Sequence, residues 1–256
     1  MPHIWCPGCG HGIVLNNLVQ SIDKLGLNKN DLVLVTGIGC SARISGYVDF
    51  HTLHTIHGRA LAFATGVKLA RPELTLLVAM GDGDALAIGG NHFIHAARRN
   101  IDITALIMNN RTYGMTGGQH SPLTGFGTKS TTAPLGNIEQ VFDTMELAKA
   151  AGASFAARGT TYHVRSLQKL LTQAIRHKGF SVVEILSQCP TYFGRKTKAG
   201  TAADMLRSYR DNTVPVGSEA KQKNPDLIER GIFVQEERTE FCTAYEGLIQ
   251  AAREGR

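Results

Sequence analysis

The residues best suited to bind a ligand are a carboxylate and an amide that each follow a short apolar run. Asp82 stands in Gly81-Asp82-Gly83-Asp84 directly after the run 74–80, and Asn110 closely follows the run 103–108. Carboxylate and amide oxygens are hard ligands that suit Mg²⁺ or Ca²⁺. Glycines let the backbone approach a ligand closely, and a helix N-terminus offers free N–H groups to phosphate oxygens. Together these features predict a site for Mg²⁺ and a diphosphate.

The elements that must position these residues are two strands and the helix between them. The two apolar runs flank a segment of helical length that ends near Arg99, which is the pattern of a βαβ unit. Ligands of open parallel sheets bind outside the carboxyl ends of the strands, and a right-handed crossover places the strands side by side or nearly so. Asp82 and Asn110 are therefore expected to face one site. The alternative is a strand-end turn with a capping aspartate and an incidental asparagine.

A second group of reactive side chains is the Cys-x-x-Cys motif near the start of the chain. Cys6 and Cys9 enclose Pro7-Gly8, which favours a tight turn, so that two thiolates can bind one metal centre. By itself this pair is compatible with a zinc knuckle, a redox pair or an iron–sulfur cluster.

Two further cysteines follow predicted strands. Cys40 lies in Gly37-Ile38-Gly39-Cys40-Ser41 after the strand 31–36, and Cys189 follows the strand 180–187. With Cys6 and Cys9 they are expected to converge beside the diphosphate site, and four thiolates suit a [4Fe–4S] cluster. Cys242, in a late helical stretch, is interpreted as a spare thiol.

Three histidines at a spacing of three residues, His51, His54 and His57, lead through Gly58-Arg59 into an alanine-rich helix at 60–70. No carboxylate or thiol nearby completes a metal shell, so anion contacts from His57, Arg59 or the helix N-terminus are favoured over metal binding. A glycine-rich segment at 111–122 is long for a connection and is expected to cover the cofactor; the alternative is a disordered loop.

Composition limits the function classes. The 256 residues suffice for one large α/β domain, and 43% hydrophobic with 19% charged residues is ordinary for a globular protein. No apolar run is long enough to cross a membrane, and no secretory signal is recognisable at the N-terminus, so a cytoplasmic protein is expected. The net charge of +6 is not accompanied by basic runs interleaved with aromatics, so nucleic acid is not indicated.

The alternation of strand and helix patterns predicts an α/β fold with a mostly parallel central sheet and helices on both faces. Two regions are expected: a cofactor-binding domain at 1–190, and a C-terminal extension at 191–256 that packs on the domain or on a partner subunit. Besides the helix at 60–70 and the strands at 31–36 and 180–187, the pattern predicts a strand at 153–157 and helices at 13–25, 137–152, 163–178 and 236–253.

The motifs in combination resemble the β subunit of 2-oxoacid:ferredoxin oxidoreductases, particularly the 2-oxoglutarate branch. Gly-Asp-Gly followed by Asn-Asn is similar to the thiamine diphosphate motif, and the motifs together span about three-quarters of the chain. The resemblance implies a thiamine diphosphate-binding fold carrying thiamine diphosphate, Mg²⁺ and one [4Fe–4S] cluster. It implies Asp82, the Asn110 side chain and the Thr112 carbonyl as Mg²⁺ ligands. It implies as cluster ligands Cys6, Cys9, Cys40 and Cys189. The residues expected around the cofactor are Gly39, Cys40, Ser41, His57, Gly58, Arg59, Gly81, Asp82, Gly83, Asp84, Asn110, Thr112, Tyr113, Gly114, Met115 and Thr116.

The implied reaction is CoA-dependent oxidative decarboxylation of a 2-oxoacid, with reduction of ferredoxin. The favoured substrate is 2-oxoglutarate, giving succinyl-CoA and CO₂, while pyruvate and branched-chain oxoacids stay open. Arg43, three residues after Cys40, is placed to meet a substrate carboxylate; the alternative is a surface arginine.

Thiamine activation normally needs a glutamate, and no convincing candidate is present, whereas in the family that residue belongs to a partner chain. The chain is therefore expected to need an α subunit, with or without γ and δ subunits. Two rival hypotheses are a subunit of a non-oxidative thiamine diphosphate decarboxylase or synthase and, from another class, a zinc-binding structural or adaptor protein.

Overall fold

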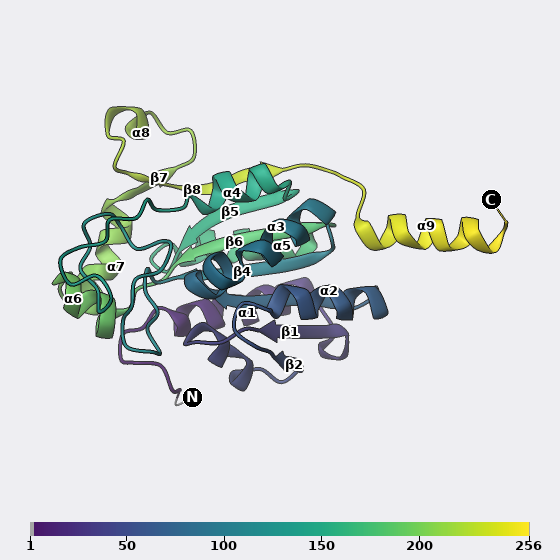
Figure 1. Cartoon of the computed structure of the whole chain (residues 1–256), viewed down its shortest axis with the longest axis horizontal. Helices are drawn as coiled ribbons and strands as arrows, with labels where there is room; N and C mark the ends of the chain where they lie inside the picture. Colours follow the sequence, from purple (N-terminus) through teal and green to yellow (C-terminus); the bar gives the residue numbers. More distant parts are fainter. Residues whose placement is uncertain (1–2, 256) are drawn as a thin grey trace.

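The centre of the molecule is an eight-stranded sheet, seen in a computed structural model that describes residues 3–255 (Figure 1). The spatial order of its strands is β2-β1-β3-β4-β6-β5-β8-β7. Their bounds are β1 Leu32–Thr36, β2 His51–His54, β3 Thr75–Gly81, β4 Ile103–Asn109, β5 Phe155–Thr160, β6 Phe180–Leu186, β7 Thr213–Pro215 and β8 Ile228–Gln235. Every pairing is parallel except that of β5 with β8. The predicted mostly parallel sheet is thus confirmed.

Helices cover both faces of this sheet, as predicted (Figure 1). One face carries α1 (His11–Leu25) and α5 (Val164–Arg176), whose apolar side chains share a core with the sheet. The opposite face is covered by three helices, α2 (Ala60–Ala70), α3 (Gly90–Arg99) and α4 (Thr144–Ala151). The middle strands β4 and β6 are buried at every residue, which explains why their sequences are continuous apolar runs rather than alternating ones.

One expectation about local structure is wrong, and one strand was not predicted. The helix expected at 137–152 begins only at Thr144, after Asp143 accepts hydrogen bonds from the backbone N–H groups of Met145 and Glu146. Ile138, which fitted the helical pattern, is 84% exposed in the preceding loop. The histidine segment at 51–54 forms the edge strand β2. Its side chains are mostly exposed and polar, so the sequence shows no apolar run there.

The C-terminal region contributes to the sheet rather than only covering it. It contains α6 (Arg195–Thr197), α7 (Ala202–Asp211) and α8 (Glu219–Lys223) along with β7 and β8. β8 lies antiparallel beside β5, inside the region expected to be an outer extension. The last helix, α9, starts at Phe241 rather than at Glu236 and runs to Arg253, projecting away from the body beyond its first turn (Figure 1). Whether a partner subunit covers this region stays a prediction.

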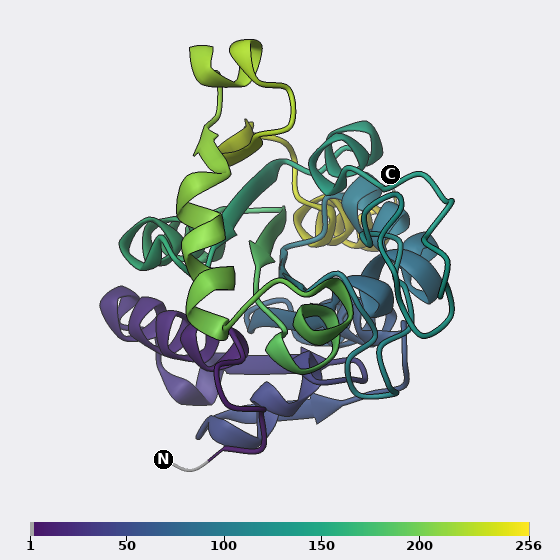
Figure 2. The ribbon, with the colours of Figure 1, turned by 90° about the vertical axis from the view of Figure 1, so that its left-hand side faces the viewer.

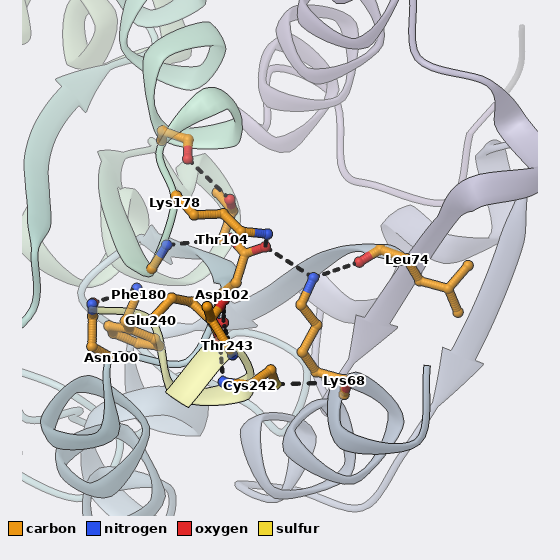
Figure 3. Close-up of polar contacts among 12 residues, drawn as sticks. Lys68, Leu74, Asn100, Asp102, Thr104, Lys178, Phe180, Glu240, Cys242 and Thr243 are labelled. Atoms are coloured by element: carbon orange, nitrogen blue, oxygen red, sulfur yellow. Dashed lines mark hydrogen bonds and ion pairs between the residues drawn. The ribbon is translucent and has the colours of Figure 1, made fainter. Parts of the chain in front are cut away.

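A buried polar network fixes the start of α9 to the core (Figure 3). The Lys68 ammonium group, only 3% exposed, lies 2.9 Å from Asp102 Oδ2 and donates a hydrogen bond to the Leu74 carbonyl. Glu240 accepts hydrogen bonds from the backbone N–H groups of Asp102 and Cys242. Cys242 is thus a buried thiol at the α9 joint, in keeping with its interpretation as spare.

Of the helices between residues 3 and 255, none is both long and apolar enough to traverse a bilayer.

Candidate active site

The site lies where the parallel strands β1, β3, β4 and β6 end. Because these strands run in one direction, the segments that follow them meet at one edge of the sheet. Figure 2 views the molecule from this side, where the long connection after β4 and the helix α6 lie. The expectation that Asp82 and Asn110 face one site is met, since both line one cavity of about 310 Å³.

The cavity wall contains nearly all the residues expected around the cofactor. It is lined by His11, Ile38, Gly39, Cys40, Ser41, His57, Gly81, Asp82, Gly83, Asp84, Asn110, Thr112, Tyr113, Gly114, Met115 and Thr116. His11 and Ile38 were not expected, although His11 stands two residues after Cys9 and Ile38 lies inside Gly37-Ile38-Gly39-Cys40-Ser41. Gly58 and Arg59, which were expected, do not line it.

The chemistry of the cavity fits a hard cation. Asp82 is 2% exposed and accepts a hydrogen bond from the Ser121 hydroxyl, and it forms no ion pair with any residue between 3 and 255. Burial raises the pKa of Asp82 to about 7, against the hydrogen bonds from Ser121 and the backbone. A buried carboxylate of this kind is stabilised when a metal ion binds to it. Asn110, 9% exposed, adds a side-chain amide to the same wall, and its Oδ1 accepts a hydrogen bond from the Thr112 N–H at 3.2 Å.

A buried network behind the cavity supports the Asn110 turn. Asn109 Nδ2 donates to Glu184 Oε1 at 2.7 Å, while Asn109 Oδ1 accepts the Arg111 N–H at 3.1 Å. Arg111 adopts a left-handed conformation with φ of 61°, so the chain turns sharply directly after Asn110. Glu184 is in turn paired with Arg158, Nε to Oε2 at 2.6 Å. Partners of this type orient a metal ligand without touching the metal.

Asp84 lies beside Asp82 but has a different environment. Its Oδ1 accepts the Gly58 N–H at 2.6 Å and lies 2.8 Å from His57 Nδ1. Burial raises the pKa of Asp84, and the contacts with Gly58 and His57 oppose that shift. A Cβ atom on Gly37 would lie 1.9 Å from Asp84 Oδ2, so only glycine fits there. Asp84 therefore joins the turn after β1, the His57 segment and the turn after β3.

This arrangement explains why Gly58 and Arg59 are not on the cavity wall. A Cβ on Gly58 would lie 2.4 Å from Ile88 Cγ2, which shows that Gly58 is a close-packing position against the turn Asp84–Ile88. Arg59 Nη1 donates to the Ile88 carbonyl at 3.2 Å. Arg59 thus contacts the backbone and does not line the cavity, and its anion contact stays a prediction, whereas His57 does line the cavity.

The four predicted thiols line a second, smaller cavity of about 130 Å³. Its wall consists of Ile4, Trp5, Cys6, Cys9, Cys40, Arg43, Asn110, Gly114, Met115, Cys189, Pro190 and Tyr192. Burial, together with the neighbouring thiols, raises the pKa of Cys9 to about 12 and that of Cys40 to about 11. Thiols this hard to ionise become thiolates when a metal centre replaces their protons.

Backbone contacts bring these thiols together from distant segments. The Cys9 N–H donates to the Cys6 carbonyl at 3.0 Å, which closes the Cys-x-x-Cys turn, and the Gly10 N–H donates to the Gln188 carbonyl at 3.0 Å. Trp5 Nε1 donates to the Cys40 carbonyl at 2.7 Å. The N-terminal segment therefore ties the turns after β1 and β6 to each other.

The four thiols surround a cavity and do not form a ready site for a single ion. Within the described chain, 3–255, no three His, Cys, Asp or Glu side chains are grouped so that they could hold one metal ion. A [4Fe–4S] cluster would take one cysteine at each iron, whereas a tetrahedral zinc ion would need all four thiols around one centre.

The two cavities adjoin. They share Cys40, Asn110, Gly114 and Met115 as wall residues. Arg43 lines the thiol cavity and not the larger one, and its side chain is exposed. No glutamate from the part of the chain that the structure describes lines either cavity.

Comparisons with known proteins agree with this geometry. A family model described as "Thiamine pyrophosphate enzyme, C-terminal TPP binding domain" matches residues 37–185. The 2-oxoglutarate synthase subunit KorB of Archaeoglobus fulgidus is 50% identical over 100% of this chain and 93% of its own length. Its counterpart from Methanocaldococcus jannaschii is 46% identical over 98% of this chain and 94% of its own length.

A solved structure is similar over the whole chain. The 2-oxoglutarate:ferredoxin oxidoreductase from Magnetococcus marinus, with 2-oxoglutarate, coenzyme A and succinyl-CoA bound, superposes with a TM-score of 0.89 at 32% identity, covering 100% of this chain and 88% of that one. Apart from His11, the residues that line the cavity with Asp82 and Asn110 lie inside the matched thiamine pyrophosphate region. The chain therefore belongs to the thiamine diphosphate-dependent 2-oxoacid:ferredoxin oxidoreductase family, with the 2-oxoglutarate synthase KorB subunits.

Proposed function

We propose that this chain is the β subunit of a 2-oxoglutarate:ferredoxin oxidoreductase. In this reaction 2-oxoglutarate and CoA give succinyl-CoA and CO₂, and the electrons released reduce ferredoxin. The observation that carries the proposal is the shared wall of the two cavities, at Cys40, Asn110, Gly114 and Met115. It puts a thiol-lined chamber for an electron acceptor directly beside a chamber for the thiamine cofactor. The names of the similar proteins support 2-oxoglutarate as the substrate.

In this proposal Asp82, the Asn110 side chain and the Thr112 carbonyl hold Mg²⁺, which anchors the diphosphate. Bound thiamine diphosphate supplies the electron sink that decarboxylation of a 2-oxoacid requires. The protein's part is to position the reactants and exclude water. Tyr113 covers the turn after β3, with its hydroxyl donating to the Gly83 carbonyl at 3.2 Å. A Cβ on Gly83 would lie 2.2 Å from Tyr113 Cζ, so glycine is required beneath that ring.

The proposed cluster ligands are Cys6, Cys9, Cys40 and Cys189. A [4Fe–4S] cluster bound there would replace the protons of Cys9 and Cys40, whose thiols burial otherwise keeps neutral. Cys40 lies on the wall of both chambers, so its backbone positions one cofactor relative to the other. Such proximity suits the transfer of electrons one at a time.

The proposed partner is an α subunit, with or without further subunits. Activation of the thiamine ring calls for a glutamate, and within residues 3–255 no glutamate reaches either cavity wall. An α subunit that supplies this carboxylate would complete the site. Turnover by the isolated chain, loaded with both cofactors, would contradict this part of the proposal.

Arg43 is proposed to bind the distal carboxylate of the substrate. Arg43 is one of the residues that line the thiol cavity, and a guanidinium binds carboxylates through two hydrogen bonds. Arg43→Ala should raise the KM for 2-oxoglutarate far more than that for pyruvate. An equal change for both substrates would remove Arg43 from substrate selection.

The experiment that tests the function is a substrate panel on the assembled enzyme. Turnover would be followed by reduction of methyl viologen with 2-oxoglutarate, pyruvate and a branched-chain 2-oxoacid, each with CoA. A clear preference for 2-oxoglutarate in kcat/KM is expected. Preference for another 2-oxoacid would show that 2-oxoglutarate is not the substrate of this enzyme. Release of CO₂ without dye reduction would instead support a non-oxidative decarboxylase.

A further inference from the structure

One thiol of the second cavity is exposed to solvent. Cys6 is exposed, whereas Cys189 is buried and Cys9 and Cys40 are half-buried. Ile4 and Tyr192, which line the same cavity, are 62% and 37% exposed. The thiol cavity therefore reaches the protein surface through a small apolar patch formed by Ile4, Cys6 and Tyr192.

A group of cations that the proposed function leaves unexplained stands next to this patch. Arg195, Lys196 and Lys198 are exposed, and their side chains form no ion pair or hydrogen bond with residues 3–255. We call these three residues the basic rim. Asp204, a nearby carboxylate in the first turn of α7, is already engaged by Arg207 at 2.6 Å and by the Thr201 N–H. The rim therefore carries a net positive charge.

Packing fixes the basic rim beside the thiols. The Gly194 N–H donates to the Cys189 carbonyl at 2.9 Å, and the Ala199 N–H donates to the Gly194 carbonyl at 3.0 Å, so α6 is held by the turn that carries Cys189. On the other side, a Cβ on Gly8 would lie 2.4 Å from Ala202 Cβ, which places the start of α7 against the Cys-x-x-Cys loop. Figure 2 shows α6 and the start of α7 close to the N-terminal segment.

We propose that the apolar patch and the basic rim form the docking surface for an acidic ferredoxin. The inference rests on the proposed function and adds the place at which the electron leaves. In each encounter one electron passes from the cluster held by the four cysteines, which is oxidised, to the iron–sulfur centre of ferredoxin, which is reduced. Oxidation of the 2-oxoacid supplies that electron.

The chemistry of the surface matches a transient redox encounter. Such complexes bury small interfaces, and complementary charge raises their rate of association more than their final affinity. A cationic rim around a small apolar contact attracts a negatively charged carrier over a distance of about one Debye length, ~10 Å at 0.1 M salt. It also orients the carrier toward Cys6, the most exposed thiol.

The test compares two doubly charge-reversed variants of the assembled enzyme. Lys196→Glu with Lys198→Glu reverses the basic rim. The control, Lys169→Glu with Lys223→Glu, makes the same charge change at exposed positions on α5 and α8. Two readouts are needed: the Kd of an acidic ferredoxin for the enzyme without substrate, and turnover with ferredoxin or with methyl viologen, which needs no docking surface.

The rim variant should raise both the Kd and the KM for ferredoxin roughly tenfold at low ionic strength. The difference should shrink at high salt, while viologen-linked turnover is undiminished and the control stays close to wild type. Ferredoxin binding equal to wild type in the rim variant would overturn the proposal, as would a parallel loss of viologen turnover. Failure of that variant to assemble with its partner subunit would assign the rim to a subunit interface instead. If the wild-type enzyme does not reduce viologen with any 2-oxoacid, the proposed function itself fails.

Discussion

Replacing Glu184 should lower the affinity for Mg²⁺ and thiamine diphosphate, although Glu184 does not line the cofactor cavity. Glu184 is 2% exposed and accepts hydrogen bonds from Asn109 Nδ2 and Arg158 Nε. Asn109 in turn holds the backbone that follows Asn110. Glu184→Gln keeps the shape and still offers Asn109 an acceptor, but it removes the charge that pairs with buried Arg158.

The expected loss of stability depends on the ion-pair partner that Arg158 keeps when Glu184 is replaced. Breaking a buried ion pair by removing one partner costs about 3–5 kcal/mol. Asp143 still lies 2.9 Å from Arg158 Nη2, so Glu184→Gln is expected at the low end, about 3 kcal/mol. Glu184→Ala also leaves the Asn109 amide without its acceptor, which adds about 1–3 kcal/mol. Because substitution of such supporting residues lowers metal affinity by about 10–100-fold, the affinity for Mg²⁺ and thiamine diphosphate should fall at least tenfold.

Urea unfolding gives the change in free energy, and Trp5 provides the binding signal. It is the one tryptophan of the sequence and lies against the Cys40 turn, which is shared by both cavities. Glu237→Gln removes the same charge at an exposed position and serves as the control. A Glu184→Gln variant that loses stability but binds Mg²⁺–thiamine diphosphate like wild type would refute the link between this network and the Asn110 turn.

Further predictions concern the turn after β1 and the α9 joint. Gly37→Ala should lower cofactor affinity, because the new Cβ would lie 1.9 Å from Asp84 Oδ2, whereas Gly46→Ala, where no atom lies within 4 Å, should bind normally in the same titration. Burial raises the pKa of Asp102, but Lys178 and Lys68 outweigh this effect and hold the pKa below its ordinary value. The Asp102 carboxylate therefore stabilises the fold above its unfolded pKa of about 4, and this stabilisation is lost as the pH falls through the lower folded value. The unfolding midpoint of wild type should drop more steeply than that of Asp102→Asn between about pH 5 and pH 3, and parallel curves would contradict this. Lys68→Met should destabilise the fold by less than the about 3–5 kcal/mol typical of a broken buried pair, because Lys178 still neutralises Asp102. A measured loss within or above that range would show that Lys178 does not compensate.

Most of the sheet could be predicted because its central strands are apolar at every position. β3, β4 and β6 were each located within a residue or two by their apolar runs. β2 was not, since its four residues, His51–His54, are mostly exposed and carry no alternation. β8 was also missed: it is only half-buried along most of its length, and its antiparallel pairing with β5 leaves no local signal.

Site residues could be predicted where two conditions are met: the side chain can bind a metal or cofactor, and the residue follows a predicted strand. Asp82, Asn110, Cys40 and Cys189 meet both conditions, whereas Cys6 and Cys9 precede the first strand and were found from the Cys-x-x-Cys spacing alone. The structure places all six residues on two adjoining cavities. His11 was missed although it stands two residues after Cys9, because nothing in the sequence shows that α1 begins there and turns its side chain inward. Gly58 and Arg59 are absent from the cavity wall, and the sequence does not show this because their packing against Ile88 depends on tertiary contacts.

The central claim is that four cysteines from separate segments hold one iron–sulfur cluster beside the thiamine site. Iron and acid-labile sulfide should be measured on the anaerobically reconstituted chain, together with its absorption spectrum. The account predicts about four irons and four sulfides per chain in the wild type, a content unchanged in Cys242→Ser, and loss of the intact cluster in Cys189→Ser. Zinc without iron in the wild type, or an iron content that depends on Cys242 and not on Cys189, would contradict it.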